Sequence, residues 1–220
     1  MSQPGPVVEH PGQGLGLAQG DLAPAIRVLE QGLALCRASD NQDQLRAIVA
    51  SLGAASALQG RLAEGRALLE EASSITLRTG SLAGHALGLA WLSEVCRRMG
   101  HRDEARQHAR QALHLARQQK ARGYEAGALH QLGVIQAHTD PPEAAQAEAH
   151  YQLALALAEE LGMRPLVAHC HRGLGTLYAA TGQREQARAE LTTAIALYRD
   201  MEMTFWLPQA ESALAQVEGR

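Results

Sequence analysis

The stretch GLGTLYAATGQREQARAELTTA, which spans residues 173–194, decides the fold of this chain. Leu174 and Tyr178 lie one helical turn apart, so they share one face of a first helix. Gly182 ends that helix, because glycine adopts the left-handed conformation that a helix C-terminus requires at little cost. Leu191 belongs to the apolar stripe of a second helix. The stretch therefore predicts two amphipathic helices joined by a tight turn.

The Leu-Gly pair of this stretch recurs along the chain at a nearly constant spacing. It returns at steps of 40, 40 and 42 residues, as Leu52-Gly53, Leu92-Ser93, Leu132-Gly133 and Leu174-Gly175. A fixed period of roughly 20–50 residues is typical of solenoids, in which each repeat packs only on its neighbours. The sequence therefore predicts an all-α superhelix of about five helix pairs followed by a C-terminal capping helix.

The same period predicts the boundaries of the repeats. A single repeat domain is expected over residues 13–218, preceded by a disordered segment at residues 1–12 that is rich in proline and glycine. The units are expected at about 13–40, 45–80, 83–122, 124–163 and 166–202, with the cap at 203–218. The turn of the fourth unit reads Thr139-Asp140-Pro141-Pro142, in which Asp140 is predicted to cap the next helix.

The fifth unit resembles the tetratricopeptide repeat family. Its residues match seven positions of the family pattern, namely Leu174, Gly175, Tyr178, Gly182, Ala187, Leu191 and Ala194. The third unit departs from the pattern, with Ser93 in place of the glycine and Cys96 in place of the aromatic residue. The resemblance implies a solenoid that binds a protein or a peptide.

A second resemblance concerns residues 160–171 and 203–207. These segments look like the C-terminal repeat region of large bacterial signalling proteins. Such proteins join an adenylate/guanylate cyclase domain, or a DNA-binding transcription domain, to a P-loop ATPase and then to the repeats. The resemblance implies a sensory tail that has ATPase or cyclase domains as partners. A P-loop needs a Gly-Lys-Ser/Thr sequence, and the only lysine is Lys120, so no ATPase is expected within these residues.

Composition excludes several classes of partner. The formal net charge is −3, so no general attraction to nucleic acid or to an anionic membrane is expected. No apolar run is long enough to span a bilayer, and the N-terminus lacks the basic start and apolar core of a signal peptide. The three cysteines are far apart and odd in number, which indicates free thiols in a reducing, cytoplasmic compartment.

In the register of the repeats, the first helix of each unit lines a concave groove. The candidate groove residues of the third to fifth units are Glu94, Arg97, Arg98, His130, Val134, His138, His169, Arg172 and Thr176. The second unit contributes mainly alanine at these positions, so the groove changes from apolar to mixed polar and cationic along the chain. This gradient predicts a ligand with an apolar stretch and some acidic side chains.

A basic stripe is predicted on the opposite, convex side. It consists of Arg102, Arg106, Arg110 and Arg117, which fall on one face of the second helix of the third unit. Residues 96–123 carry eight basic and two acidic residues, whereas residues 140–163 carry five acidic residues and no lysine or arginine. Two interpretations stay open, a solvated face and a docking surface for an acidic partner. Nucleic acid is disfavoured, because no aromatic residues interleave with the stripe.

The sequence predicts no catalytic residues, no cofactor and no metal ligands. His169 and His171 flank Cys170, but residues two apart on a helix point in nearly opposite directions. His130 and His138 have no cysteine or carboxylate at ligand spacing. Three classes of function remain, a regulatory tail, a stand-alone scaffold and, least favoured, an enzyme, for which no set of nucleophile, base and acid can be assembled.

The N-terminal end of the array is expected to be incomplete. The helix around residues 21–36 has a full apolar face, but its expected partner near residues 12–19 offers only Leu15 and Leu17. An uncovered apolar edge normally meets another repeat or another chain. The edge is therefore expected to contact the chain's own upstream N-terminal repeats or to mediate self-association.

Overall fold

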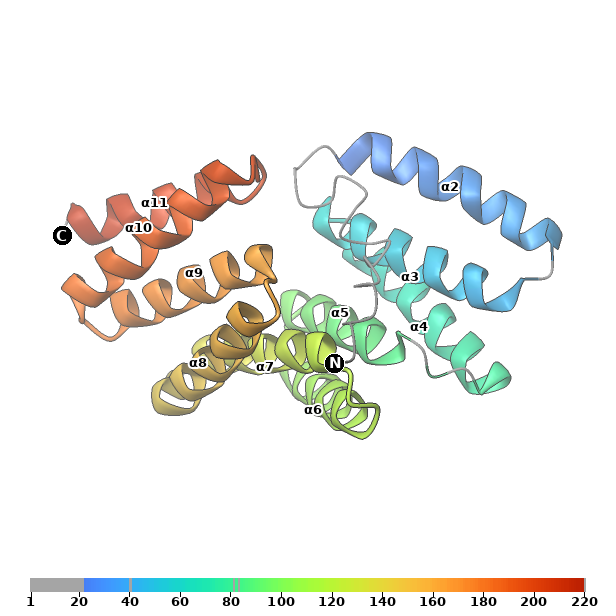
Figure 1. Cartoon of the computed structure of the whole chain (residues 1–220), viewed down its shortest axis with the longest axis horizontal. Coiled ribbons are helices and arrows are strands. Elements are labelled where there is room, and N and C mark those ends of the chain that lie inside the picture. Colours follow the sequence, from blue (N-terminus) through green and yellow to red (C-terminus); the bar gives the residue numbers. More distant parts are fainter. Residues whose placement is uncertain (1–21, 40, 81, 83, 220) are drawn as a thin grey trace, which may run out of the picture.

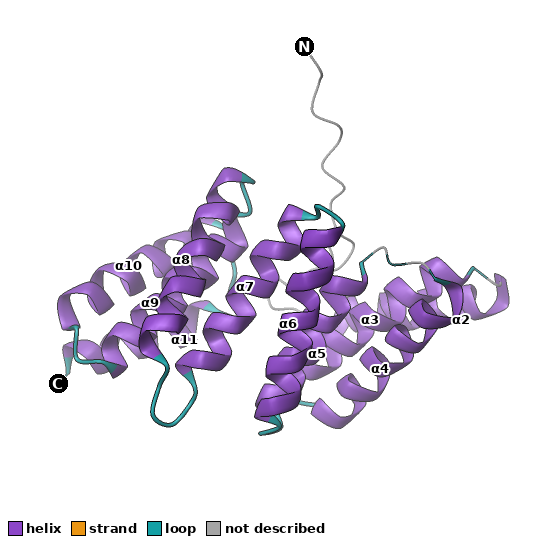
Figure 2. Cartoon of the chain, turned by 90° about the horizontal axis from the view of Figure 1, so that it is seen from below, coloured by secondary structure: helices purple, strands orange, loops and turns teal. Residues whose placement is uncertain are grey.

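A computed structural model describes residues 22–39, 41–80, 82 and 84–219, and all regular structure in these ranges is helical (Figures 1 and 2). The helices are α2 (Leu22–Ser39), α3 (Gln42–Leu58), α4 (Leu62–Thr79), α5 (His85–Arg98), α6 (Arg102–Gln118), α7 (Arg122–Ala137), α8 (Ala144–Glu160), α9 (Arg164–Ala180), α10 (Arg184–Asp200) and α11 (Leu207–Glu218). The segment 1–12 and the helix expected near residues 12–19 lie outside the described residues.

The helices form hairpins that stack into an open arc. The hairpins are α3–α4, α5–α6, α7–α8 and α9–α10, with α2 before them and α11 after them. Figure 1 shows α2 and α11 at the two ends of the arc and α5 to α8 in its middle. The all-α superhelix of repeated helix pairs that the sequence predicts is confirmed.

The two helices of a hairpin occupy different sides of the arc. Each first helix packs on the first helix of the next unit, in the order α3, α5, α7, α9 and α11. The second helices of successive units do not pack on each other within the described residues. They are linked by long side chains, as where Arg66 of α4 donates a hydrogen bond to Glu104 of α6. The first helices therefore form the inner side of the arc.

Glycine conformation sets the turn inside a hairpin. Gly100, between α5 and α6, has φ of 84°, and Gly182, between α9 and α10, has φ of 81°. These values lie in the left-handed region that glycine adopts without a steric penalty.

The longer turn of the fourth unit differs from the sequence prediction, because α8 begins only at Ala144 and its N-cap residue is Glu143. The predicted Asp140 cap is therefore wrong.

Small residues bring the two helices of each hairpin close together. A Cβ atom on Gly175 of α9 would lie 2.6 Å from Cγ of Leu191 on α10, whose side chain is fully buried. The third unit has Ser93 at the corresponding position. Its hydroxyl donates a hydrogen bond of 2.8 Å to the backbone carbonyl of Ala105 on α6. The crossing therefore excludes any larger side chain.

We expect Gly175→Ala to destabilise the protein by about 1–3 kcal/mol, because the new methyl group overpacks the contact with Leu191. Gly127→Ala on α7 is the matched control, since a Cβ atom there meets nothing within 4 Å. Alanine is favoured over glycine inside a helix, so this control is expected to stabilise by up to about 1 kcal/mol. Urea denaturation of the two variants tests this, and a Gly175→Ala protein as stable as the wild type would contradict the close crossing.

Candidate functional site

Five rings meet where α7, α9 and the turn before α11 come together. We call them the groove cluster; they are His130, Tyr151, His169, Tyr198 and Trp206. The His130 and His169 ring centroids lie 6.1 Å apart, and each imidazole also contacts a tyrosine of a second helix. Trp206 meets the His169 ring edge-on at 4.8 Å. The cluster thus joins the fourth unit, the fifth unit and the C-terminal cap.

Tyr151 reaches this cluster between two glycines. It comes from α8, a second helix, and is 2% exposed. A Cβ atom on Gly133 of α7 would lie 2.9 Å from Cδ1 of Tyr151, and one on Gly173 of α9 would lie 2.5 Å from Cε1. Because neither residue has a side chain, the tyrosine ring passes between α7 and α9 and contacts His130.

Burial keeps the groove cluster electrically neutral. Desolvation, aided by the positive charge of Arg172, lowers the pKa of His130 from its ordinary value of 6.5 to about 4. The same causes lower the pKa of His169 well below its ordinary value. Burial raises the pKa of Tyr198 to about 12, and the Tyr198 hydroxyl lies 2.7 Å from Nδ1 of His169. At neutral pH both imidazoles are therefore uncharged.

Arg172 places a positive charge at the edge of the cluster. Its guanidinium carbon lies 5.0 Å from the ring centroid of Trp206, which is cation–π geometry. Its NH1 donates a hydrogen bond of 2.8 Å to Oε1 of Gln209 on α11. Both of these partners are neutral, and no ion pair involves Arg172 within the described part of the chain. The charge is thus held in place without being neutralised.

A second charged group lies on α5. Arg97 donates two hydrogen bonds of 2.8 Å to the two carboxylate oxygens of Glu94, three residues earlier. Burial lowers the pKa of Arg97, but the hydrogen bonds and charge of Glu94 outweigh that effect and raise it. Both residues act electrostatically on His130. They bring the third unit into the same region as the groove cluster.

The other predicted groove residues make contacts away from the cluster. Arg98 donates a hydrogen bond of 2.6 Å to the carbonyl oxygen of Ala57 on α3. His138 lies just after α7, with Nδ1 2.7 Å from the carbonyl oxygen of Val134. Thr176 donates a hydrogen bond to the carbonyl oxygen of Arg172. Val134 packs against the core of the fourth and fifth units. The structure therefore gathers Glu94, Arg97, His130, His169 and Arg172 around one cluster.

Sequence reasoning missed the aromatic half of this site. Tyr151 and Tyr198 are 2% and 0% exposed, so their rings belong to the core and contact the two imidazoles from inside it. The available signal was their register on the second helices, since Tyr151 corresponds to Leu69, Ala109 and Leu191 and Tyr198 corresponds to Thr76, Ala116 and Ala158. Period alone does not show that a ring at either position contacts an imidazole of a first helix.

The convex stripe lies on α6, where two of its arginines form ion pairs. Arg106 contacts Glu143 at 2.6 Å, and Arg117 contacts Glu125 at 2.8 Å. Arg102 and Arg110 are exposed. Such exposed or half-exposed pairs typically contribute about 0–1 kcal/mol.

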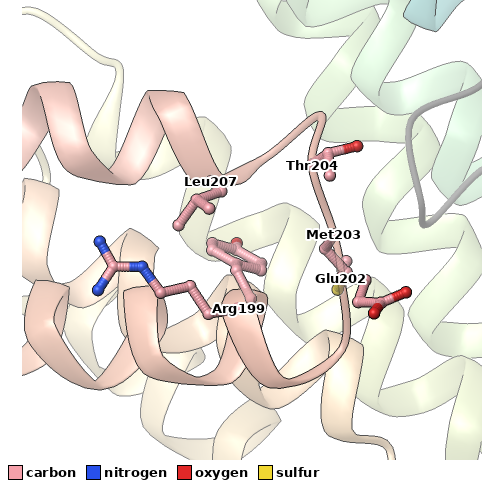
Figure 3. A pocket seen from close by; sticks show the side chains of 6 residues that line it. Arg199, Glu202, Met203, Thr204 and Leu207 are labelled. Carbon is pink, nitrogen blue, oxygen red and sulfur yellow. The ribbon is translucent and has the colours of Figure 1, made fainter.

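One surface pocket lies at the turn between α10 and α11 (Figure 3). It is lined by Tyr198, Arg199, Glu202, Met203, Thr204 and Leu207. Arg199 is paired with Glu211 at 2.6 Å, and the lining contains neither histidine nor cysteine. The pocket thus offers no pairing of a nucleophile with an imidazole base.

The His169-Cys170-His171 run divides between two partners. His169 faces Tyr198, whereas Nδ1 of His171 lies 2.6 Å from Oε2 of Glu190. Cys170 is fully buried, and burial raises the pKa of its thiol to about 12. The three side chains do not converge.

Within the described residues, none of the helices has the length and hydropathy needed to traverse a bilayer.

Comparison with known proteins relates the chain to tetratricopeptide repeats. Residues 124–200 match the Tetratricopeptide repeat family TPR_12. No curated protein is similar in sequence. Among solved structures, BtubC (BKLC) from P. vanneervenii superposes with a TM-score of 0.67 and 19% identity, over 90% of this chain and 83% of that one. A Podosopora anserina protein with nearly identical TPR-like repeats of the kinesin light chain type superposes with a TM-score of 0.55 and 19% identity. The match covers 88% of this chain and 99% of that one. These likenesses show the fold.

The neutral imidazoles make stability depend on pH. The unfolded chain binds a proton at His130 below about pH 6.5, whereas the folded chain binds it only near pH 4. The stability that this group contributes is therefore present above pH 6.5 and is lost as the pH falls toward 4. Between about pH 7.5 and pH 5 the expected loss from His130 is about 2 kcal/mol.

Urea denaturation of the wild type and of His130→Gln at both pH values measures this contribution. The variant is expected to lose less stability on acidification, because glutamine does not titrate. His114→Gln, at an exposed position on α6, is the control and should keep the wild-type pH dependence. An unchanged pH dependence in His130→Gln would show that this imidazole titrates in the folded protein as it does in the unfolded chain.

Proposed function

We propose that this chain is a non-catalytic protein-interaction module whose inner groove binds a peptide or a segment of another protein. The observation that carries the proposal is Arg172, a cation held by a tryptophan ring and a neutral amide beside an uncharged aromatic cluster. Tetratricopeptide repeats are in general protein-interaction modules, and the fold is of that type.

The chemistry of the groove selects the ligand. The partly exposed face of Trp206 and the neutral His169 ring suit an apolar or aromatic side chain. Arg172 suits a carboxylate next to it, since guanidinium groups bind carboxylates in bidentate geometry. We therefore propose a ligand with an acidic residue beside an apolar one.

The titration behaviour supports a non-catalytic role. A catalytic cysteine acts as a thiolate and needs a lowered pKa. Burial instead raises the pKa of both Cys96 and Cys170. The imidazoles of the groove cluster pair with tyrosine hydroxyls and rings rather than with an activated nucleophile.

For the biological context we propose the regulatory, sensory tail of a bacterial cyclase-type or transcription-type signalling ATPase in the cytoplasm. The support is the resemblance of residues 160–171 and 203–207 to the repeat regions of such proteins. The coding sequence upstream of Met1 tests it. A cyclase or P-loop ATPase sequence joined in frame would support the tail, and its absence would favour a stand-alone scaffold or adaptor.

The N-terminal edge is proposed as a second contact surface. On α2, Val28 is 52% exposed and Leu35 is 72% exposed. Either upstream repeats or a second copy of the chain would cover such side chains. Sedimentation velocity over a range of concentrations distinguishes these cases, with Leu35→Asp expected to abolish any self-association. A wild type that stays monomeric throughout would exclude the second copy.

Selection from a library of random peptides tests the groove. Peptides that bind the purified chain are expected to be enriched in aspartate or glutamate next to an aromatic or branched apolar residue. Arg172→Gln should weaken the selected peptides at least about tenfold, or about 1.4 kcal/mol, in isothermal titration calorimetry. The glutamine keeps a polar side chain at this position and removes the charge.

Arg110→Gln on the convex side is the matched control for the same substitution. It should leave the affinity unchanged, because Arg110 lies on α6, an outer helix. If the selected peptides bind Arg172→Gln as well as the wild type, the groove proposal fails. If instead only Arg110→Gln loses binding, the interaction surface is the convex stripe.

A further inference from the structure

Three side chains with metal-binding chemistry converge between α5 and α6, away from the groove cluster. They are Cys96, in the last turn of α5, and Glu104 and His108, one turn apart on α6. One ligand atom of each lies within 4.8 Å of the ligand atoms of the other two. The sequence analysis assigned no metal ligands here, because the three residues come from two helices and spread over 13 positions.

The fourth unit shows what these positions do when they are purely structural. Gln136, Gln146 and His150 occupy the places of Cys96, Glu104 and His108. The Gln136 amide lies 2.8 Å from Oε1 of Gln146 and 2.7 Å from Nδ1 of His150. The three side chains thus satisfy one another by neutral hydrogen bonds.

In the third unit, the corresponding side chains do not form such a set of hydrogen bonds. Nδ1 of His108 is buried and has no hydrogen-bond partner among the described residues. The Cys96 thiol makes only a long contact of 3.9 Å to Oε2 of Glu104. A buried polar atom without a partner costs stability, so its presence requires an explanation. A metal cation, which accepts a lone pair from the imidazole nitrogen and from the sulfur, would provide that explanation.

We propose that Cys96, Glu104 and His108 bind a divalent cation of the zinc class and thereby join α5 to α6. Thiolate, imidazole and carboxylate are the ligands that Zn²⁺ takes in proteins, in a tetrahedral arrangement. His101 stands beside Glu104, with Nδ1 3.5 Å from Oε1 of Glu104 and 2.8 Å from NH1 of Arg66, and lies outside the group of converging ligand atoms. The site is independent of the function proposed for the groove.

Arg66 is the group that competes with the cation. It donates to Oε2 of Glu104 at 2.8 Å, and it also holds Oε1 of Glu70 at 2.7 Å. When Glu104 turns to the metal, Arg66 therefore keeps a carboxylate partner. Binding replaces the proton of the Cys96 thiol with the metal, and that proton is released to solvent.

Titration of the untagged, full-length chain with Co²⁺ tests the site. A cobalt–thiolate bond produces a charge-transfer absorption in the near ultraviolet, and tetrahedral Co²⁺ absorbs strongly in the visible region. We expect both signals to saturate at one equivalent and to disappear when Zn²⁺ is added. We also expect Zn²⁺ to raise the melting temperature, because a ligand that binds only the folded state stabilises it.

Cys96→Ser and His108→Gln should each abolish the charge-transfer band or weaken Zn²⁺ binding by at least about tenfold. Cys170→Ser and His150→Gln are the matched controls, a second buried thiol and the same position in the fourth unit. Both should keep the signal. Survival of the band in Cys96→Ser, or its loss in Cys170→Ser, would overturn the proposal.

X-ray absorption spectroscopy of the zinc-loaded wild type provides a test that needs no variant. We expect a single sulfur ligand at about 2.3 Å, with nitrogen and oxygen ligands completing the shell. A shell without sulfur would place the metal elsewhere and refute the site. Failure of this proposal leaves the groove proposal unaffected, since Arg172 and the groove cluster include none of the three ligands.

Discussion

The close crossing of the two helices inside each unit is the constraint on which the rest of the structure depends. Gly175 faces the fully buried Leu191, and Ser93 meets the backbone of Ala105 through its hydroxyl. With small residues at these points, the hairpin behaves as one thin layer. Such thin hairpins stack on one another, and their first helices pack together along the inner side of the arc.

The same use of small residues creates the groove cluster. Tyr151 passes between Gly133 and Gly173 and so brings an aromatic ring from an outer helix into contact with His130 on a first helix. The imidazoles that it meets are desolvated and stay neutral. Charge is confined to the edge, where Arg172 lies over Trp206. A neutral aromatic cluster, of which the Trp206 ring is partly exposed, thus stands beside one held cation.

Comparison between units separates structural positions from functional ones. The fourth unit fills the space between its helices with Gln136, Gln146 and His150, which bond to one another. The third unit keeps the histidine but exchanges both amides for a thiol and a carboxylate. That exchange removes neutral hydrogen bonds and concentrates ligand atoms in a small volume.

The sequence by itself determined the repeat, the helix pairs and the left-handed turns at Gly100 and Gly182, because these depend on residues less than one period apart. It also put His130, His169 and Arg172 on the first helices of their units, because helical register is local. Only the tertiary structure decided that Tyr151, Tyr198 and Trp206 join them, and that Cys96 meets His108. Those contacts depend on how deeply a side chain of one helix enters the layer of the next. That depth is set by the glycines at the crossings and by the angle between units, which no single repeat encodes.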